Sequence, residues 1–341
     1  MGATAFLSDP FLGQPTWAWL IFAAIVVALL VLDLGVLHRK DREIPVGESL
    51  ILSAGYIAVA LLFGGFLWWQ LGPQPGMAYF TGYLVEKTLS LDNIFVISLI
   101  FGALAVPRAL QHRVLFYGIL GVVVMRAIVI GFGTSLVAEF EWLLYLFGAF
   151  LILTGVKMLL TADKPADMAD SRILRFLRRH LRLTDGLRGR AFVVREADTA
   201  GRLRWFATPL LLALLMVEIA DIIFAVDSVP AILAITTDPY IVYTSNIFAI
   251  LGLRALYFAL AASVHRFHYL KYALALVLVF IGGKIFVNHI FGKLDATISL
   301  GVTLALLAGG ILVSLLKTRP AEPEGAAPPV PAEPSAGDAK A

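Results

Sequence analysis

The chain has 341 residues, of which 60% are hydrophobic and only 15% are charged, and its formal net charge is +3. Soluble globular domains are about 45–50% apolar and about 25% charged, so this composition predicts a protein of the lipid bilayer. The chain contains no cysteine, which excludes disulfides, thiolate metal sites and thiol redox chemistry by its own side chains.

Nine apolar segments follow one another along the chain. A helix needs about 20 mainly apolar residues to cross roughly 30 Å of hydrocarbon. Residues 1–16 precede the first segment without any Lys or Arg, so we expect no cleaved secretory signal and a retained first helix. The predicted transmembrane helices are 17–37, 49–68, 78–101, 113–132, 142–160, 207–234, 243–263, 269–287 and 295–316. We therefore predict an all-α, polytopic membrane protein with about nine transmembrane helices.

Lys and Arg are concentrated in alternate connections between these helices. Cytoplasmic loops of membrane proteins are enriched in both residues, so we predict an N-terminus outside and a C-terminus in the cytoplasm. The predicted organisation is an outside N-terminal segment (1–16), a first membrane half (17–160), a basic cytoplasmic loop (161–206), a second membrane half (207–318) and a disordered Pro-rich tail (319–341).

The basic loop holds 11 of the 27 Lys and Arg residues, all between positions 164 and 204. Its stretch RILRFLRRHLRL, residues 172–183, intersperses Arg with Leu, Ile and Phe at helical spacing. Such a helix can lie on the surface of a membrane with anionic lipids, and a solvated cytoplasmic linker is the equally open alternative. We expect no nucleic-acid partner, and the sequence identifies no protein partner.

Two of the predicted spans carry carboxylates among Phe, Leu, Ile and Val. The stretches VEKTLSLDNIFVI (85–97) and MVEIADIIFAVDSVPAI (216–232) together contain five: Glu86, Asp92, Glu218, Asp221 and Asp227. Acids near the midplane cost about 2.5–3.5 kcal/mol each on insertion scales, so five unpaired acids would cost about 12–17 kcal/mol. Such residues usually face a polar cavity, pair with cations or bind an ion. We predict an ion site, with Arg126 and Arg254 as charge-balancing partners, and a purely structural charge network is the alternative.

The two acidic stretches also resemble each other. Their alignment pairs Glu86 with Asp221, Asp92 with Asp227 and Asn93 with Ser228. The segments GILG (118–121) and AILG (249–252) follow at similar distances. Because the two spans run in opposite directions in the predicted topology, the match predicts a weak inverted repeat. Transporters with inverted repeats bind their substrate near the midplane, where the halves meet.

Helical geometry complicates a single site. At about 100° per residue, Asp227 lies about 120° round the helix from Asp221, and Asp92 lies equally far from Glu86. Pro230 has no N–H to bond the carbonyl of Val226, so we expect the helix to kink or break beside Asp227. Such interrupted helices recur at the cation sites of transporters.

The side chains of these stretches offer mainly oxygen atoms as metal ligands. Carboxylate, amide and hydroxyl oxygens suit Mg²⁺, Ca²⁺ or Mn²⁺ and disfavour Zn²⁺, Cu⁺ and Ni²⁺. The predicted metal ligands are Glu86, Asp92, Asn93, Glu218, Asp221, Asp227, Ser228 and Asn246. The metal is expected as a transported ion, with no permanently bound cofactor. No G-x-x-x-x-G-K-[ST] loop is present, so no ATPase is implied. We predict a transporter and not an enzyme.

Four stretches carry a resemblance to a known family: LDLGVLHRK (32–40), VEKTLSLDNIFV (85–96), VPRALQHRVLFYGILGVVVMRAI (106–128) and VEIADIIFAVDSVPAILAITTDPYIVYTSNIFAILGLRALYF (217–258). In these stretches the sequence resembles the TerC/Alx family of bacterial integral membrane proteins. The resemblance implies a multi-span protein of the bacterial cytoplasmic membrane, linked by name to tellurite resistance and by function to manganese efflux and the metalation of exported proteins. It also implies that both acidic motifs form the ion site.

The function that we predict is a secondary transporter that exports a divalent cation, with Mn²⁺ as the ion that the resemblance implies. Asp92 and Asp227 are predicted as central ligands, and the other acids complete the site or carry protons. One alternative is a membrane platform of a tellurite or metal-stress resistance complex, without transport of its own. Another is an intramembrane aspartyl hydrolase, for which the usual G-x-G-D context is missing around both aspartates.

Overall fold

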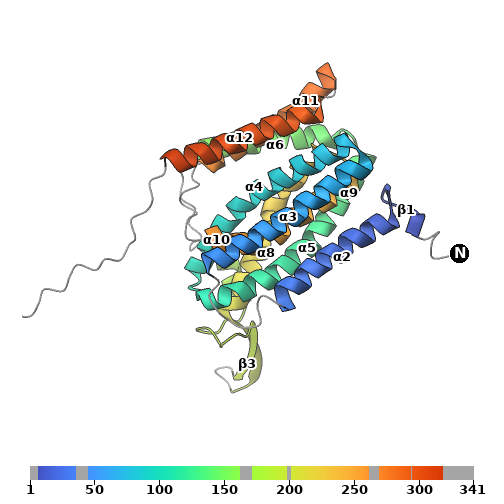
Figure 1. The fold of residues 1–341 in the computed structure, drawn as a ribbon. Coiled ribbons are helices and arrows are strands. Elements are labelled where there is room, and N and C mark those ends of the chain that lie inside the picture. Colours follow the sequence, from blue (N-terminus) through green and yellow to red (C-terminus); the bar gives the residue numbers. More distant parts are fainter. Residues whose placement is uncertain are drawn as a thin grey trace, which may run out of the picture.

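A computed structural model describes residues 7–35, 45–161, 171–197, 201–260, 269–292 and 294–317. Figure 1 shows a bundle of long helices, with a small β-hairpin that projects beyond one end. The predicted N-terminal segment is described only from residue 7, and the predicted basic loop only outside 162–170 and 198–200. The predicted tail at 319–341 lies outside the described residues.

The described residues confirm the all-α class. The helices of the bundle are α2 (Thr16–Gly35), α3 (Val46–Leu71), α4 (Pro73–Ala103), α5 (Arg108–Glu139), α6 (Leu143–Thr161), α8 (Pro209–Leu233), α9 (Pro239–Leu251), the short α10 (Leu253–Leu260), α11 (Leu270–Phe291) and α12 (Ala296–Lys317). The shorter elements are β1 (Pro10–Phe11), β2 (Gln14–Pro15), α7 (Arg172–His180), β3 (Val193–Ala197) and β4 (Leu203–Ala207). The strands form two separate antiparallel pairs, β1 with β2 and β3 with β4.

Each of the nine predicted spans overlaps a described helix, or α9 and α10 together, and the span ends at 36–37 and 261–263 lie outside the described residues. Within the described residues, seven helices are long and apolar enough to cross a membrane, with α9 and α10 counted as one, and α2 contains a shorter apolar stretch. α4 is 31 residues long but carries three charged residues in its middle. The chain is therefore a polytopic helical membrane protein, while the count of nine and the orientation remain predictions.

The helices pack in a pattern that matches the predicted inverted repeat. The first unit is α4, α5 and α6, and the second is α8, α9 with α10, and α11. α4 packs against α9 as α8 packs against α5, and α4 also contacts α8. The last helices of the two units, α6 and α11, meet each other where Gly148 approaches Gly282. Small residues allow such close approach of membrane helices.

Aromatic side chains hold α9 against α3 and α4. The Phe63 ring of α3 lies 4.8 Å from the Phe248 ring of α9 and 6.0 Å from the Tyr79 ring of α4, measured between centroids. The hydroxyl of Tyr79 donates to the carbonyl of Ala60 at 2.9 Å. This packing fixes the position of α9, which carries one of the predicted ligands, Asn246.

The predicted seventh span is interrupted at Gly252, which separates α9 from α10. Lys87 of α4 caps this end of α9, because its Nζ donates to the carbonyl of Ala249 at 3.1 Å. A positive charge is favoured there by the partial negative charge at the end of a helix. A Cβ at position 252 would lie 2.8 Å from the lysine Nζ, so glycine leaves room for the cap.

Of the kink or break predicted beside Asp227, the break does not occur. α8 continues through Asp227 and Pro230 and ends at Leu233. Proline removes one backbone hydrogen bond, but Pro230 lies in the final turn, so the helix ends soon after this loss. The break in the second repeat unit is therefore at Gly252 and not at the proline.

The start of α9 provides a stability prediction. The side chain of Asp238 accepts hydrogen bonds from the backbone N–H groups of Tyr240, at 2.9 Å, and Ile241, at 3.4 Å. Replacing Asp238 with Ala is expected to lower the free energy of unfolding by about 1 kcal/mol, the usual cost of losing such a cap. The measurement is denaturant unfolding of the purified protein in mixed micelles. Asp238→Asn keeps an accepting oxygen and should unfold like wild type, and equal losses in both variants would contradict this role.

Candidate intramembrane ion site

The guanidinium of Arg126, in α5, lies at the centre of a buried polar network. Its Nη1 donates to Oε1 of Glu86 at 2.6 Å, to Oγ of Ser228 at 2.7 Å and to Oδ1 of Asn246 at 3.3 Å. Its Nε and Nη2 each donate to one carboxylate oxygen of Asp221 at 3.1 Å. The contact with Asp221 therefore uses the two-pronged geometry in which a guanidinium binds a carboxylate most specifically.

Two amides complete the network. Nδ2 of Asn246 donates to Oε2 of Glu86 at 3.0 Å, and Nδ2 of Asn93 donates to Oδ1 of Asp221 at 3.3 Å. Arg126, Glu86 and Asp221 are 1%, 2% and 6% exposed. Charges at this depth are tolerated only when they are paired and hydrogen-bonded. Two carboxylates and one guanidinium leave the network with a formal charge of −1 when all three are ionised.

The contacts around Arg126 agree with the predicted inverted repeat. Glu86 of α4 shares the arginine Nη1 with Ser228 of α8, whereas Asn93 of α4 bonds to Asp221 of α8. The earlier residue of each helix therefore lies near the later residue of the other, so the two segments run in opposite directions. Both members of two of the three aligned pairs, Glu86 with Asp221 and Asn93 with Ser228, belong to the network.

Three of the eight predicted ligands lie outside this network. The carboxylate of Asp227 accepts a hydrogen bond from Oγ1 of Thr154, in α6, at 3.3 Å. Asp92 has Lys271 of α11 as its electrostatic neighbour. Glu218 is partly buried beside α5, where a Cβ at Gly121 would collide with its carboxylate.

The expectation of one site with Asp92 and Asp227 at its centre therefore does not match the geometry. Because α8 stays helical through Asp227, this carboxylate points about 120° away from Asp221, and the same angle separates Asp92 from Glu86. Within the part of the chain that the structure describes, no three His, Cys, Asp or Glu side chains form a group that could hold a metal ion. The neutral ligands Asn93, Ser228 and Asn246 lie with Arg126.

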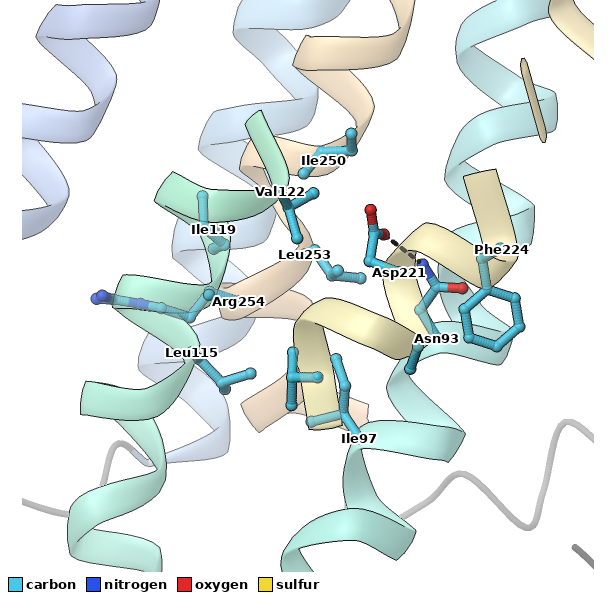
Figure 2. Close-up of a pocket in the computed structure, with 13 residues that line it drawn as sticks. Asn93, Ile97, Leu115, Ile119, Val122, Asp221, Phe224, Ile250, Leu253 and Arg254 are labelled. Atoms are coloured by element: carbon cyan, nitrogen blue, oxygen red, sulfur yellow. Dashed lines mark hydrogen bonds between the residues drawn. The ribbon is translucent and has the colours of Figure 1, made fainter. Parts of the chain in front are cut away.

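A pocket opens beside this network. Its lining residues come from α4, α5, α8, α9 and α10 and are Asn93, Ile97, Leu115, Gly118, Ile119, Val122, Val217, Ala220, Asp221, Phe224, Ile250, Leu253 and Arg254. The cavity volume is only about 20 Å³, room for about one water molecule or ion, and the cavity is partly open to the exterior. Figure 2 shows Asp221 and Asn93 together at one side, among apolar side chains. The pocket extends toward the ends where α5 and α8 begin, which is the predicted cytoplasmic side.

Two polar groups of the pocket differ in their role. The Oδ1 atom of Asn93 is buried and has no hydrogen-bond partner among the described residues. It therefore remains able to accept a hydrogen bond or to bind a cation. Arg254 is 3% exposed, and Figure 2 shows its guanidinium directed away from Asp221. Of the two predicted charge-balancing arginines, Arg126 is the one that contacts the acids of the network.

A family model described as "Integral membrane protein TerC family" matches residues 71–322, which include both repeat units. The chain belongs to the TerC family. This confirms the resemblance that the acidic motifs indicated. The comparison with solved structures found no match for this TerC family member.

Three curated proteins show how similar known sequences are to this TerC family member. An "Uncharacterized membrane protein STKORF319" of Myxococcus xanthus is 49% identical over 91% of this chain and 95% of its own length. Proteins of Salmonella typhi and Escherichia coli K12 are 46% and 44% identical over 87% of this chain and 93% of theirs. Both are named "Putative membrane-bound redox modulator Alx".

The sequence did not indicate several contacts of the polar side chains within the membrane. Thr154 is one hydroxyl in an apolar span, and only the packing of α6 against α8 brings it to Asp227. Lys271 is at the start of a span, where a cation normally reaches the membrane surface. The pairing of Lys87 with a backbone carbonyl depends on the break at Gly252, which no residue pattern indicated.

Proposed function

We propose that this TerC family member is a secondary transporter that exports a divalent metal cation, Mn²⁺, across the cytoplasmic membrane of a bacterium. The observation that supports this most is the pair of buried carboxylates, Glu86 and Asp221, related by the inverted repeat and joined through one guanidinium. A purely structural ion pair would need only one acid for Arg126. The second acid leaves a negative charge that a cation can neutralise. The proposal is of a transporter and not of an enzyme.

When no substrate is bound, Arg126 pairs with both carboxylates and offsets one of their two negative charges. A cation entering through the pocket meets Asp221 and the free Oδ1 of Asn93 first. Hard divalent cations take about six or more oxygen ligands, so the ion also needs the carboxylate oxygens that Arg126 now occupies. Displacement of the guanidinium from Asp221 would couple arrival of the ion to a rearrangement between α5 and α8.

Manganese is proposed for two reasons. The atoms that the network can offer as metal ligands are all oxygens, which suits Mg²⁺, Ca²⁺ and Mn²⁺ among the divalent ions. The family resemblance of the acidic motifs implies manganese among these three. Asp92, Asp227 and Glu218 are proposed to carry exchanged protons or to bind the ion in another conformation, because Arg126 does not hold them.

Flux of Mn²⁺ into liposomes containing the purified protein tests the proposal. Asp221→Asn and Glu86→Gln remove one charge each with almost no change in shape. Each is expected to lower the flux by about 10–100-fold, the usual cost of disturbing the groups around a metal. Glu139, exposed at the end of α5, supplies the control variant Glu139→Gln, which should transport like wild type. Flux equal to that of empty liposomes, or acid variants as active as wild type, would refute the proposal.

A second candidate is a membrane platform of a tellurite or metal-stress resistance complex. The folded basic segment around α7 and the β3–β4 hairpin favours it, because transport through the bundle does not require such a segment. In that case, deleting the hairpin would abolish resistance in cells, while Asp221→Asn would leave resistance intact. The redox role in the names of the relatives fits this candidate only through a partner, since the chain has no thiol.

A further inference from the structure

The basic segment between the two repeat units is folded. We call its described residues, 171–197 and 201–207, the basic module; they comprise α7 and the β3–β4 hairpin. Ser171 caps α7 by accepting a hydrogen bond from the N–H of Leu174 at 3.1 Å. The chain after α7 joins the hairpin, because Thr184 donates its N–H to the carbonyl of Ala207 at 3.0 Å. A solvated linker, one of the two readings of residues 172–183, would have neither feature.

The basic module is fastened to the ends of α5 and α8. Thr208, directly before α8, donates its hydroxyl to the carbonyl of Ala191 at 2.7 Å and its N–H to the carbonyl of Phe192 at 3.0 Å. The ring of Phe192 lies 5.2 Å from the ring of Tyr117 and 5.3 Å from the guanidinium of Arg113, both in α5. The module therefore has a fixed place at the end of the bundle, where Figure 1 shows the hairpin.

One face of the hairpin presents large apolar side chains to the outside. In the strand register, Arg195 is opposite Trp205 and Ala197 is opposite Leu203. Leu203 is 62% exposed and Trp205 is 67% exposed. Soluble surfaces seldom gather such residues without a partner. The next residue of β3 on the other face, Glu196, is instead paired with Arg188, at 2.6 Å.

α7 adds positive charge to the same module. Its buried side holds Leu174, which is 2% exposed. At about 100° per residue, the opposite side of the helix carries four residues within about 100° of one another: Arg172, Arg175, Phe176 and Arg179. Between positions 164 and 204 the chain has 11 Lys and Arg against five Asp and Glu. This surplus favours an anionic partner.

The position of the hairpin indicates which anionic surface is in reach. Trp205 is four residues before Pro209, where α8 begins. Four extended residues span at most about 13 Å, and the headgroup layer on each side of the hydrocarbon is about 6 Å thick. Trp and Arg are both favoured at this depth, the first for its amphipathic ring and the second for its long stem.

We propose that the basic module binds anionic phospholipid headgroups of the bilayer that α8 enters, with Leu203 and Trp205 inserted at headgroup depth. Arg195 and the arginines of α7 supply the attraction to the lipid phosphates. The module is then a lipid-binding site beside the start of α8, and its occupancy depends on the anionic lipid content of the membrane. This inference is independent of whether the bundle transports a metal.

A spin label at position 203 tests the proposal in the intact protein. The chain has no cysteine, so Leu203→Cys introduces the only thiol to be labelled. The protein is reconstituted in vesicles of phosphatidylcholine, with or without phosphatidylglycerol. With phosphatidylglycerol, the label should collide with oxygen dissolved in the bilayer and be shielded from a water-soluble nickel chelate. Asp185, an exposed acid of the same module, supplies the control Asp185→Cys, whose label should remain accessible to nickel.

Charge removal completes the test. In the labelled protein, Arg172→Gln, Arg175→Gln and Arg179→Gln together should shift the insertion equilibrium toward water on the order of a hundredfold, or about fivefold for each arginine. Added salt should act in the same direction. A label accessible to nickel in both lipid mixtures would overturn the proposal and favour a soluble protein partner. Shielding that is equal in both mixtures would also overturn it, because it would indicate a contact with a second copy of the chain.

Discussion

Replacing Arg126 with Gln is expected to lower the free energy of unfolding by about 3–5 kcal/mol, because it leaves two buried carboxylates without their counter-charge. Glu86 and Asp221 are almost entirely buried, and each takes at least one hydrogen bond from the guanidinium. Arg126→Lys keeps the charge but loses the two-pronged contact with Asp221, so its loss should be smaller. Denaturant unfolding of the purified protein in mixed micelles measures both.

A compensated variant separates the stability role of Arg126 from its role in transport. With Arg126→Gln, Glu86→Gln and Asp221→Asn combined, no charge remains in the network, and the amides can bond to one another. Replacing a whole buried ion network is often neutral or stabilising, so this variant should regain most of the lost stability. It should still fail to transport Mn²⁺. Wild-type stability of Arg126→Gln alone would show that the acids do not depend on this pairing.

The fold could be predicted largely from the sequence because the bilayer imposes a simple rule on length and polarity. Each predicted span has its helix, with described ends that differ by one to seven residues. The exception is the span at 243–263, which the structure divides at Gly252. A glycine in an apolar helix is common, and nothing near position 252 in the sequence reveals that Lys87 approaches from another helix.

The site could be predicted in part. Alignment of the two acidic stretches identified Glu86, Asp221, Asn93 and Ser228 as related, and these four meet around Arg126. The prediction also placed Asp92 and Asp227 beside these four residues, and the structure does not. That placement required a break in α8 at Pro230, but a proline in the last turn ends a helix without redirecting the residues before it. Periodicity alone had placed these two acids on another side.

The contact between α6 and α11 is the place where a single methyl group should have a large effect. A Cβ at position 282 would lie 2.6 Å from the backbone carbonyl oxygen of Gly148 and 3.0 Å from Cγ1 of Ile152. Backbone atoms cannot yield without moving the helix, so Gly282→Ala should lower the free energy of unfolding by about 1–3 kcal/mol. Gly282→Leu should lower it further. Unfolding in mixed micelles is again the measurement.

The adjacent glycine provides a matched control for this contact. A Cβ at Gly283 would have nothing within 4 Å, so Gly283→Ala should leave stability unchanged or raise it slightly, as alanine favours helices. Equal effects at both positions would mean that close approach of α6 and α11 is not needed. A loss confined to Gly282 would instead locate the contact between the two repeat units at this glycine pair. Since α6 also carries Thr154, which bonds to Asp227, separating the helices would then disturb an acid of the second unit as well.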